Sequence, residues 1–238
     1  SITATEFDAR LEQLRGLYPK GVAYVTQNLF GSHDSNRIGS HIVNRGIANF
    51  RDWGGYFKAS SVSTSPLYKV RKPTVDELQL QKLFVTLQMT YVGAPMVYYG
   101  DEVGMWGAND PDDRKPMVWD DINYEDEVTQ PDGTKRPADA VTVNKDLQQH
   151  YTKLLKLRNS LPALQLGSFT TLVTDDSRDL YAFERSYQQQ RVRVLLNNSN
   201  SPAEFQLSHD GLNWQEQLDK LSVSRKGDKI YLTVPAKW

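Results

Sequence analysis

The stretch of sequence that decides the fold is Asn28-Leu29-Phe30-Gly31-Ser32-His33-Asp34-Ser35-Asn36-Arg37. It has the pattern of a buried strand whose last residues deliver a histidine and an aspartate to a loop. A second apolar run, Met96-Val97-Tyr98-Tyr99, ends in the same way at Gly100-Asp101-Glu102, and a polar loop over residues 108–115 follows it. Helical patterns precede each run. The order helix, strand, helix, strand predicts parallel βα units.

The composition is that of a globular protein, with 39% hydrophobic and 24% charged residues in a chain of 238. A net charge of -1 without a Lys/Arg block does not suggest a nucleic-acid partner. There is no cysteine, which excludes disulfides and is compatible with either cytoplasm or periplasm, so localisation stays open. No apolar run is long enough to span a bilayer. Because the chain opens at Ser1-Ile2-Thr3-Ala4, we expect it to begin inside a longer protein.

Local patterns predict the first elements. Thr5 is the predicted cap of a helix with an apolar stripe at Phe7, Leu11 and Leu14, ended by Gly16 and Pro19. Residues 23–30 read as a strand of mixed polarity, which suits a barrel strand that carries polar site residues near its end. Residues 38–72 form a long connection with little periodicity. Its aromatic residues suit either sugar stacking or packing of the connection onto the fold: Trp53, Tyr56 and Phe57.

Two later helices and a β region follow. Thr74 and Glu77 have the spacing of a capping box, and the helix they open ends at Gly93 and Pro95. A turn is predicted at Pro131-Asp132-Gly133, and a last helix begins near Asn144. From about Gly167 apolar residues alternate with period two between turn clusters, which predicts a small antiparallel domain. We therefore expect a βα part over 1–165 and an antiparallel β domain over 166–238.

Taken together, these motifs resemble glycoside hydrolase family 13, the α-amylase superfamily. Phe30-Gly31-Ser32-His33-Asp34 resembles its fourth conserved region, and residues 93–105 resemble its eighth barrel strand. The loop from Gly107 to Met117 is similar to that of the neopullulanase, cyclomaltodextrinase and maltogenic amylase group, and Tyr181-Ala182-Phe183-Glu184-Arg185 is similar to a strand of the family's C-terminal domain. The resemblance implies the last two βα units of a (β/α)₈ barrel followed by a small β-sandwich.

The resemblance also implies site residues. His33 and Asp34 would hold the hydroxyls of the sugar whose bond is cut, with Asp34 stabilising the transition state. For Asp34 the alternative is a cap for a helical turn at residues 35–38. Asp110 and Arg114 would grip a sugar farther along, or form an ion pair that stabilises the loop. Arg37 would line the site or bridge a carboxylate.

Other polar residues are not expected to bind a ligand. Asp101 and Glu102 are interpreted as structural, since adjacent strand residues point to opposite faces. No metal-ligand motif is present among the four histidines, and no cofactor is expected. Three of them, His41, His150 and His209, are interpreted as solvent-exposed or packing residues.

Two groups required for glycoside cleavage by retention are absent from the sequence. The family's nucleophile lies in a Gly-x-Arg-x-Asp phrase, which does not occur here, and no glutamate has the context of the general acid. We therefore expect the isolated chain to be inactive. Two parallel strands cannot close a barrel, so we expect a partner: the N-terminal barrel segment or a second copy.

The expected partner molecule is an α-glucan oligosaccharide such as a maltooligosaccharide, cyclodextrin, pullulan or starch chain. Three alternatives stay open from the sequence. The chain is a carbohydrate-binding module, a structural fragment without activity, or part of an α-glucan transglycosylase, since water and sugar acceptors use the same intermediate.

Overall fold

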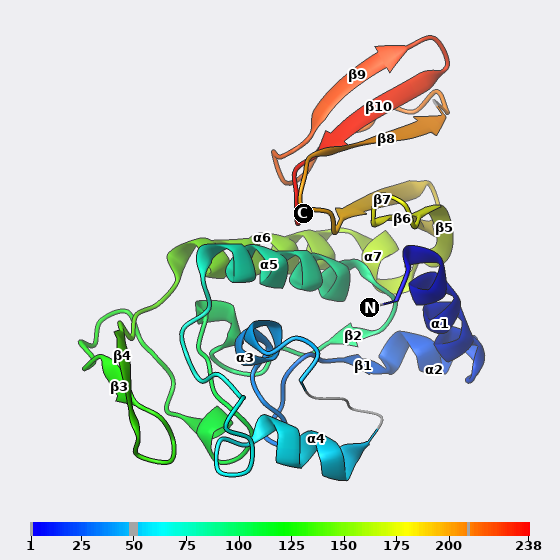
Figure 1. Cartoon of the computed structure of the whole chain (residues 1–238). Helices are drawn as coiled ribbons and strands as arrows, with labels where there is room; N and C mark the ends of the chain where they lie inside the picture. Colours follow the sequence, from blue (N-terminus) through cyan, green and yellow to red (C-terminus); the bar gives the residue numbers. More distant parts are fainter. Residues whose placement is uncertain (1, 48–51, 209) are drawn as a thin grey trace. The chain divides into compact units, whose positions relative to one another are not determined.

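The computed structural model describes residues 2–47, 52–208 and 210–238 (Figure 1). Its contacts define two compact units that are interleaved along the chain. The first unit comprises residues 1–27, 83–94 and 153–238, and the second comprises residues 28–82 and 95–152. Each unit therefore brings together segments that are far apart in the sequence.

The N-terminal helices of the first unit differ from the prediction in two respects. α1 spans Ala4–Gly16, and its cap is Thr3, whose hydroxyl accepts from the backbone N–H of Glu6 at 3.1 Å. Thr3 has the extended backbone that a cap requires, whereas the predicted cap, Thr5, already lies inside the helix. α2 spans Lys20–Val25. It occupies the start of the predicted strand over 23–30, and that prediction is wrong for most of its length.

The strands near the two motifs are short. β1 is Gln27–Asn28 and pairs with β2, Ala94–Pro95. Ala94 N–H donates to the carbonyl of Thr26 at 2.8 Å and Met96 N–H donates to that of Asn28 at 2.9 Å, so the bonds advance in the same direction along both segments, as in a parallel pair. The second strand lies two residues before the predicted run at 96–99. Backbone groups need hydrogen-bond partners, and residues 23–25 of the predicted first strand find them within α2.

The long helices agree with the sequence. α5 spans Val75–Thr90, and its predicted capping box is confirmed: Thr74 N–H donates to Glu77 Oε2 at 2.8 Å, and Glu77 N–H donates to Thr74 Oγ1 at 3.3 Å. α6 spans Lys145–Ser160, with Asn144 Oδ1 accepting from Leu147 N–H, and α7 spans Pro162–Leu166. Among the described residues no helix combines the length and apolarity that a membrane crossing needs.

The antiparallel strands predicted for the C-terminal region are confirmed. One sheet has the order β5-β6-β7 and another the order β8-β10-β9, and every pair in them is antiparallel. An apolar core contains Leu180, Ala182, Phe205, Val234 and Trp238. The strands are β5 (Ser168–Asp175), β6 (Leu180–Tyr187), β7 (Gln190–Asn197), β8 (Ala203–Ser208), β9 (Ser222–Lys226) and β10 (Lys229–Val234).

In the first unit, two buried arginines bind backbone carbonyls at the end of α5 and in the turn that follows it. Arg158 donates to the carbonyls of Met89, Tyr91 and Gly93. Arg185 donates to those of Thr90 and Gly167 at 2.7 and 3.0 Å. The carbonyls at a helix end have no partner within the helix, and the planar guanidinium has enough donors to bind several of them. These contacts fix the connection between α5 and β2.

In the second unit the connection over 38–72 contains α3 (Ile38–Val43) and α4 (Trp53–Ser60), although no regular structure is predicted there. Residues 48–51 of this connection lie outside the described ranges. Tyr56 is fully buried, which places it in the packing role. Two short 3₁₀ turns follow, η1 (Asp101–Val103) and η2 (Asp112–Arg114), and then β3 (Glu127–Thr129) and β4 (Lys135–Asp139). The turn predicted at 131–133 is confirmed between these strands, with Gly133 at a φ of 85°.

Candidate functional site

His33 and Asp34 lie at the tip of a tight turn in the second unit. Ser32 and Ser35 form a bridge at its base, and Asp34 N–H donates to Ser32 Oγ at 3.2 Å. The two side chains contact each other, with His33 Nε2 3.2 Å from Asp34 Oδ2. Helix α3 begins later, and its N-cap, Arg37, makes no side-chain capping bond. No helical turn forms over residues 35–37, so Asp34 does not have the capping role that is its alternative.

The buried residues that follow this turn anchor it through hydrogen bonds. Asn36 N–H donates to the hydroxyl of Tyr56 at 2.9 Å, and the Asn36 side chain bonds the hydroxyls of Tyr56 and Tyr68. Arg37 N–H donates to the carbonyl of Gly107 at 3.2 Å. The segment after Asp34 is thus bound both to the aromatic residues of the long connection and to the start of the loop that carries Asp110.

Arg114 brings the predicted residues of the two loops together. Its Nη2 lies 3.0 Å from Asp110 Oδ2 and 3.7 Å from Asp34 Oδ1, and its Nε donates to the carbonyl of His33 at 3.0 Å. Four of the five predicted site residues therefore form one cluster. Their side chains are open to solvent, with exposed fractions of 68% for His33, 57% for Asp34, 45% for Arg114 and 41% for Asp110.

The solvent exposure of these four side chains determines how much their ion pairs stabilise the fold. Ion pairs between solvent-exposed side chains stabilise a fold by about 0–1 kcal/mol. Hydrogen bonds from a charged group to a neutral partner are worth about 1.5–3 kcal/mol. The pairs of Arg114 with Asp34 and Asp110 therefore add little to folding.

Arg37, the fifth predicted residue, is fully buried next to the cluster. Its Nη1 donates to the carbonyl of Tyr99 at 2.6 Å and lies 3.3 Å from Asp101 Oδ1. Its guanidinium also lies 4.7 and 4.8 Å from the ring centres of Tyr98 and Tyr99. Burial raises the pKa of Asp101 to about 7, and the positive charge of Arg37 acts against that rise. In this position Arg37 supports the tyrosines and Asp101.

Asp113 is a residue that sequence reasoning missed. It is fully buried in η2, and neither carboxylate oxygen has a hydrogen-bond partner in another described residue. Burial raises its pKa to about 7, and the nearby charge of Asp110 acts in the same direction. Tyr98 donates to its backbone carbonyl at 3.4 Å. Asp113 stands in a run of acids, and nothing in the local sequence distinguishes the buried one from its neighbours.

In the described part of the chain, no three His, Cys, Asp or Glu side chains gather in a way that would hold a metal ion. The cluster presents two carboxylates, an imidazole and a guanidinium. Asp34 and Asp110 supply acceptors, Arg114 supplies a fork of donors, and His33 supplies a ring N–H.

Comparisons with known proteins identify the family to which the chain belongs. The model of the alpha amylase catalytic domain matches residues 69–167, and that of the maltogenic amylase C-terminal domain matches residues 169–237. Neopullulanase 2 from Thermoactinomyces vulgaris is 31% identical over 236 residues, 98% of this chain and 32% of that protein. A cyclomaltodextrinase from Geobacillus thermopakistaniensis is 30% identical over 209 residues, 88% of this chain and 27% of that protein. The chain spans about a third of the length of these curated relatives.

Solved structures give the same result. A cyclomaltodextrinase superposes with a TM-score of 0.64 at 26% identity, covering 94% of this chain and 30% of that one. The α-amylase from H. orenii superposes with a TM-score of 0.67 at 19% identity, covering 99% of this chain and 43% of that one, which shows a shared fold. The chain therefore belongs to the α-amylase family, in which it carries part of the catalytic domain followed by a C-terminal domain of the maltogenic amylase type.

Proposed function

We propose that this chain is the part of an α-glucan hydrolase that holds the sugar during cleavage. His33 and Asp34 bind the glucose whose bond is cut, and Asp110 and Arg114 bind a sugar farther along the glucan. The observation that carries the proposal is the bridge formed by Arg114, which lies 3.0 Å from Asp110 and 3.7 Å from Asp34. One guanidinium thereby joins the two predicted pairs into a single hydroxyl-binding surface.

The chemistry of cleavage explains why such groups are useful. Cleavage passes through an oxocarbenium-like state, and hydrogen bonds to the ring hydroxyls that tighten in this state lower the barrier. In this proposal Asp34 accepts from vicinal hydroxyls and the His33 imidazole donates to a hydroxyl oxygen. Neither group forms or breaks a covalent bond. They act by holding the sugar and by favouring its distorted form.

The nucleophile and general acid of a retaining mechanism are assigned to other polypeptide. Two acids near the cluster, Asp101 and Asp113, are buried, so they do not face a bound sugar. The remaining barrel segment, or a second copy of the chain, is the proposed source. This agrees with the apolar side chains exposed on α1, on α2 and in the turn between them: Leu14, Leu17, Tyr18, Val22 and Val25.

The proposed architecture places this chain at the end of a barrel. Residues 1–165 form the last two βα units of a (β/α)₈ barrel, and residues 166–238 form the β-sandwich domain. The parallel bonds between β1 and β2, with α5 between them in sequence and α6 after them, support the barrel assignment. In such barrels the groups that perform the chemistry follow the strands, and the turn carrying His33 and Asp34 does follow β1.

The proposal is tested by incubating the purified chain with maltohexaose, β-cyclodextrin and pullulan. We expect saturable binding of maltohexaose without release of reducing ends. Asp34→Ala should abolish most of the binding, whereas Asp228→Ala, an exposed acid in the turn between β9 and β10, should leave it unchanged. Turnover that survives Asp34→Ala would contradict the proposal. Binding that gains no hydrolysis when the rest of the barrel is added back would favour a carbohydrate-binding module.

A further inference from the structure

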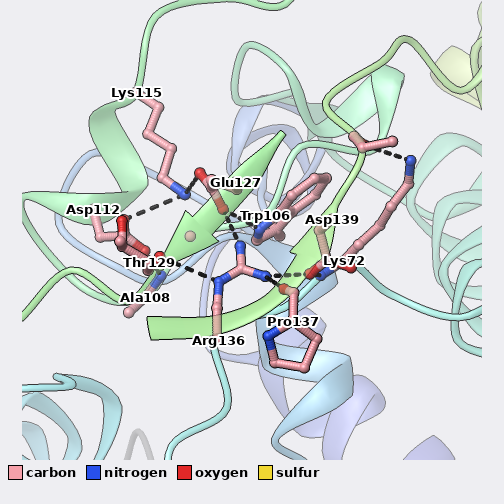
Figure 2. A network of polar contacts seen from close by, with 12 residues as sticks. Lys72, Trp106, Ala108, Asp112, Lys115, Glu127, Thr129, Arg136, Pro137 and Asp139 are labelled. Atoms are coloured by element: carbon pink, nitrogen blue, oxygen red, sulfur yellow. Dashed lines mark hydrogen bonds and ion pairs between the residues drawn. The ribbon is translucent and has the colours of Figure 1, made fainter. Parts of the chain in front are cut away.

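One carboxylate, that of Glu127 on β3, binds both ends of the loop that carries Asp110 and Arg114 (Figure 2). The indole Nε1 of Trp106, just before the loop, donates to Glu127 Oε2 at 2.7 Å. The Nζ of Lys115, just after Arg114, donates to Glu127 Oε1 at 2.5 Å. A side chain from a different segment therefore contacts both ends of the loop.

The same carboxylate is fixed by its own hairpin. Arg136 on β4 pairs with Glu127 and with Asp139, and its Nε donates to the carbonyl of Thr129 at 3.2 Å. Asp139 Oδ2 in turn accepts from Lys72 N–H at 2.8 Å. Charge-assisted contacts of this kind are the stronger and more directional class of hydrogen bonds. Glu127 is thus held in one orientation by groups that do not belong to the loop.

Within the loop, further contacts leave little freedom. Lys115 Nζ also lies 3.3 Å from Asp112 Oδ1, and Asp112 Oδ2 accepts from Ala108 N–H at 2.6 Å. The carbonyl of Lys115 accepts from the Tyr99 hydroxyl at 2.7 Å. Gly107 packs so closely that a Cβ there would lie 2.6 Å from the carbonyl oxygen of Asp112. The backbone is fixed on both sides of Asp110 and Arg114, and these two side chains point to solvent.

We propose that Glu127 is a positioning residue for the sugar-binding pair, and that the β3–β4 hairpin sets the geometry with which Asp110 and Arg114 meet a glucan. The inference rests on the proposed function of that pair. A site that must bind a sugar with two side chains gains affinity when both are held in place before the ligand arrives. Glu127 touches no sugar in this proposal and acts only through the ends of the loop.

The hairpin is poorly suited to a purely stabilising role. β3 and β4 have only three and five residues, and isolated two-stranded hairpins are marginally stable in water. Val128, the residue next to Glu127 on β3, is exposed. The polar contacts of Glu127 are directed at Trp106 and Lys115. Loss of these contacts should therefore change the geometry of the loop more than the stability of the fold.

The test measures maltotriose affinity of the full chain by calorimetry. Glu127→Gln keeps an oxygen that accepts from Trp106 but removes the charge that holds Lys115 and Arg136. We expect its dissociation constant to rise about tenfold, the size of one lost charge-assisted bond. Glu125→Gln, an exposed neighbour of the same chemistry, is the matched control and should bind like the unmodified chain. Thermal unfolding is recorded for each variant.

A double-mutant cycle separates positioning from general structure. If Glu127 acts through Arg114, then Arg114→Ala in the Glu127→Gln background should cost less than it costs alone. Additive losses, or unchanged affinity of Glu127→Gln, would overturn the inference while leaving the proposed function intact. An unmodified chain that does not bind maltotriose would overturn both. If Glu127→Gln does not fold, Lys115→Gln replaces it, because it breaks one of the two end contacts, and the same expectation applies.

Discussion

Arg114 Nη2 lies 3.7 Å from Asp34 Oδ1, although the two residues belong to different loops of the second unit. The same guanidinium reaches Asp110 Oδ2 at 3.0 Å. Asp34 follows β1, and Arg114 lies in η2, which follows β2. The contact therefore joins the two segments that the sequence motifs single out. All three side chains are accessible to a ligand. The relationship is therefore the geometric basis for treating the two motifs as one site.

Replacing Arg114 by lysine should weaken glucan binding. A lysine keeps the charge but has no planar fork, so it cannot hold Asp110, Asp34 and the His33 carbonyl at the same time. We expect the dissociation constant for maltotriose to rise about tenfold, with the stability of the fold changed by less than about 1 kcal/mol. Arg10→Lys on α1 is the control. Unchanged affinity of Arg114→Lys would remove Arg114 from the site.

Replacing Arg37 by methionine should destabilise the fold. The substitution leaves the Asp101 carboxylate buried without its cation, and breaking one partner of a buried pair typically costs about 3–5 kcal/mol. Urea unfolding checks this. The double variant Arg37→Met, Asp101→Asn should recover part of the loss, because no charge then stays buried. A single variant within about 1 kcal/mol of the unmodified chain would show that the pair is not needed.

The stability of the chain should depend on pH through Asp113. Burial raises the pKa of this carboxyl to about 7, above the value of about 4 in an unfolded chain. The folded state therefore keeps a proton that the unfolded state has lost. The contribution is complete below about pH 4 and is lost as the pH rises through 7, with a slope of at most about 1.4 kcal/mol per pH unit.

Urea unfolding between pH 4 and pH 8 tests the role of Asp113. Asp113→Asn should flatten the fall in unfolding free energy over this range, whereas Asp228→Asn should reproduce the profile of the unmodified chain. Asp101 titrates in the same direction, so some slope should persist in Asp113→Asn. Identical slopes in Asp113→Asn and the unmodified chain would show that folding does not shift the pKa of Asp113.

Arg158→Lys should also lower stability, in the first unit. Arg158 donates to the carbonyls of Met89 and Tyr91 at 2.8 and 3.2 Å and also to that of Gly93. An ammonium group cannot reach all three in the same geometry, and each buried carbonyl left without a partner costs about 1–3 kcal/mol. We expect a loss in that range by urea unfolding. A loss no larger than that of Arg10→Lys would contradict this role.

The sequence predicted those parts of the fold that depend on local patterns. The capping box of Thr74 and Glu77, helix α6 and the period-two strands after Gly167 are set by residues close together in the chain. The strand over 23–30 was wrong because a strand also needs a partner at a distance. Over residues 20–25 the backbone forms a helix instead, and only Gln27 and Asn28 are paired.

Some residues of the candidate site were also predictable from the sequence, and others were not. The motif around His33 and Asp34 and the loop with Asp110 and Arg114 are recognisable in the sequence, and in the structure Arg114 contacts both. Glu127 and Asp113 were not found. Glu127 makes its contacts with Trp106 and Lys115 from a hairpin that carries no motif, and the burial of Asp113 depends on the direction of one 3₁₀ turn.

The most direct test of the central claim is the NMR signal of the Arg114 Nε–H group, which donates to the His33 carbonyl at 3.0 Å, during a titration with maltotriose. The account predicts that this signal shifts with a saturable dependence on maltotriose, that the Arg10 signal stays fixed, and that Asp34→Asn weakens the response. An Arg114 signal that does not move at maltotriose concentrations that saturate the chain, or that moves equally in Asp34→Asn, would contradict it.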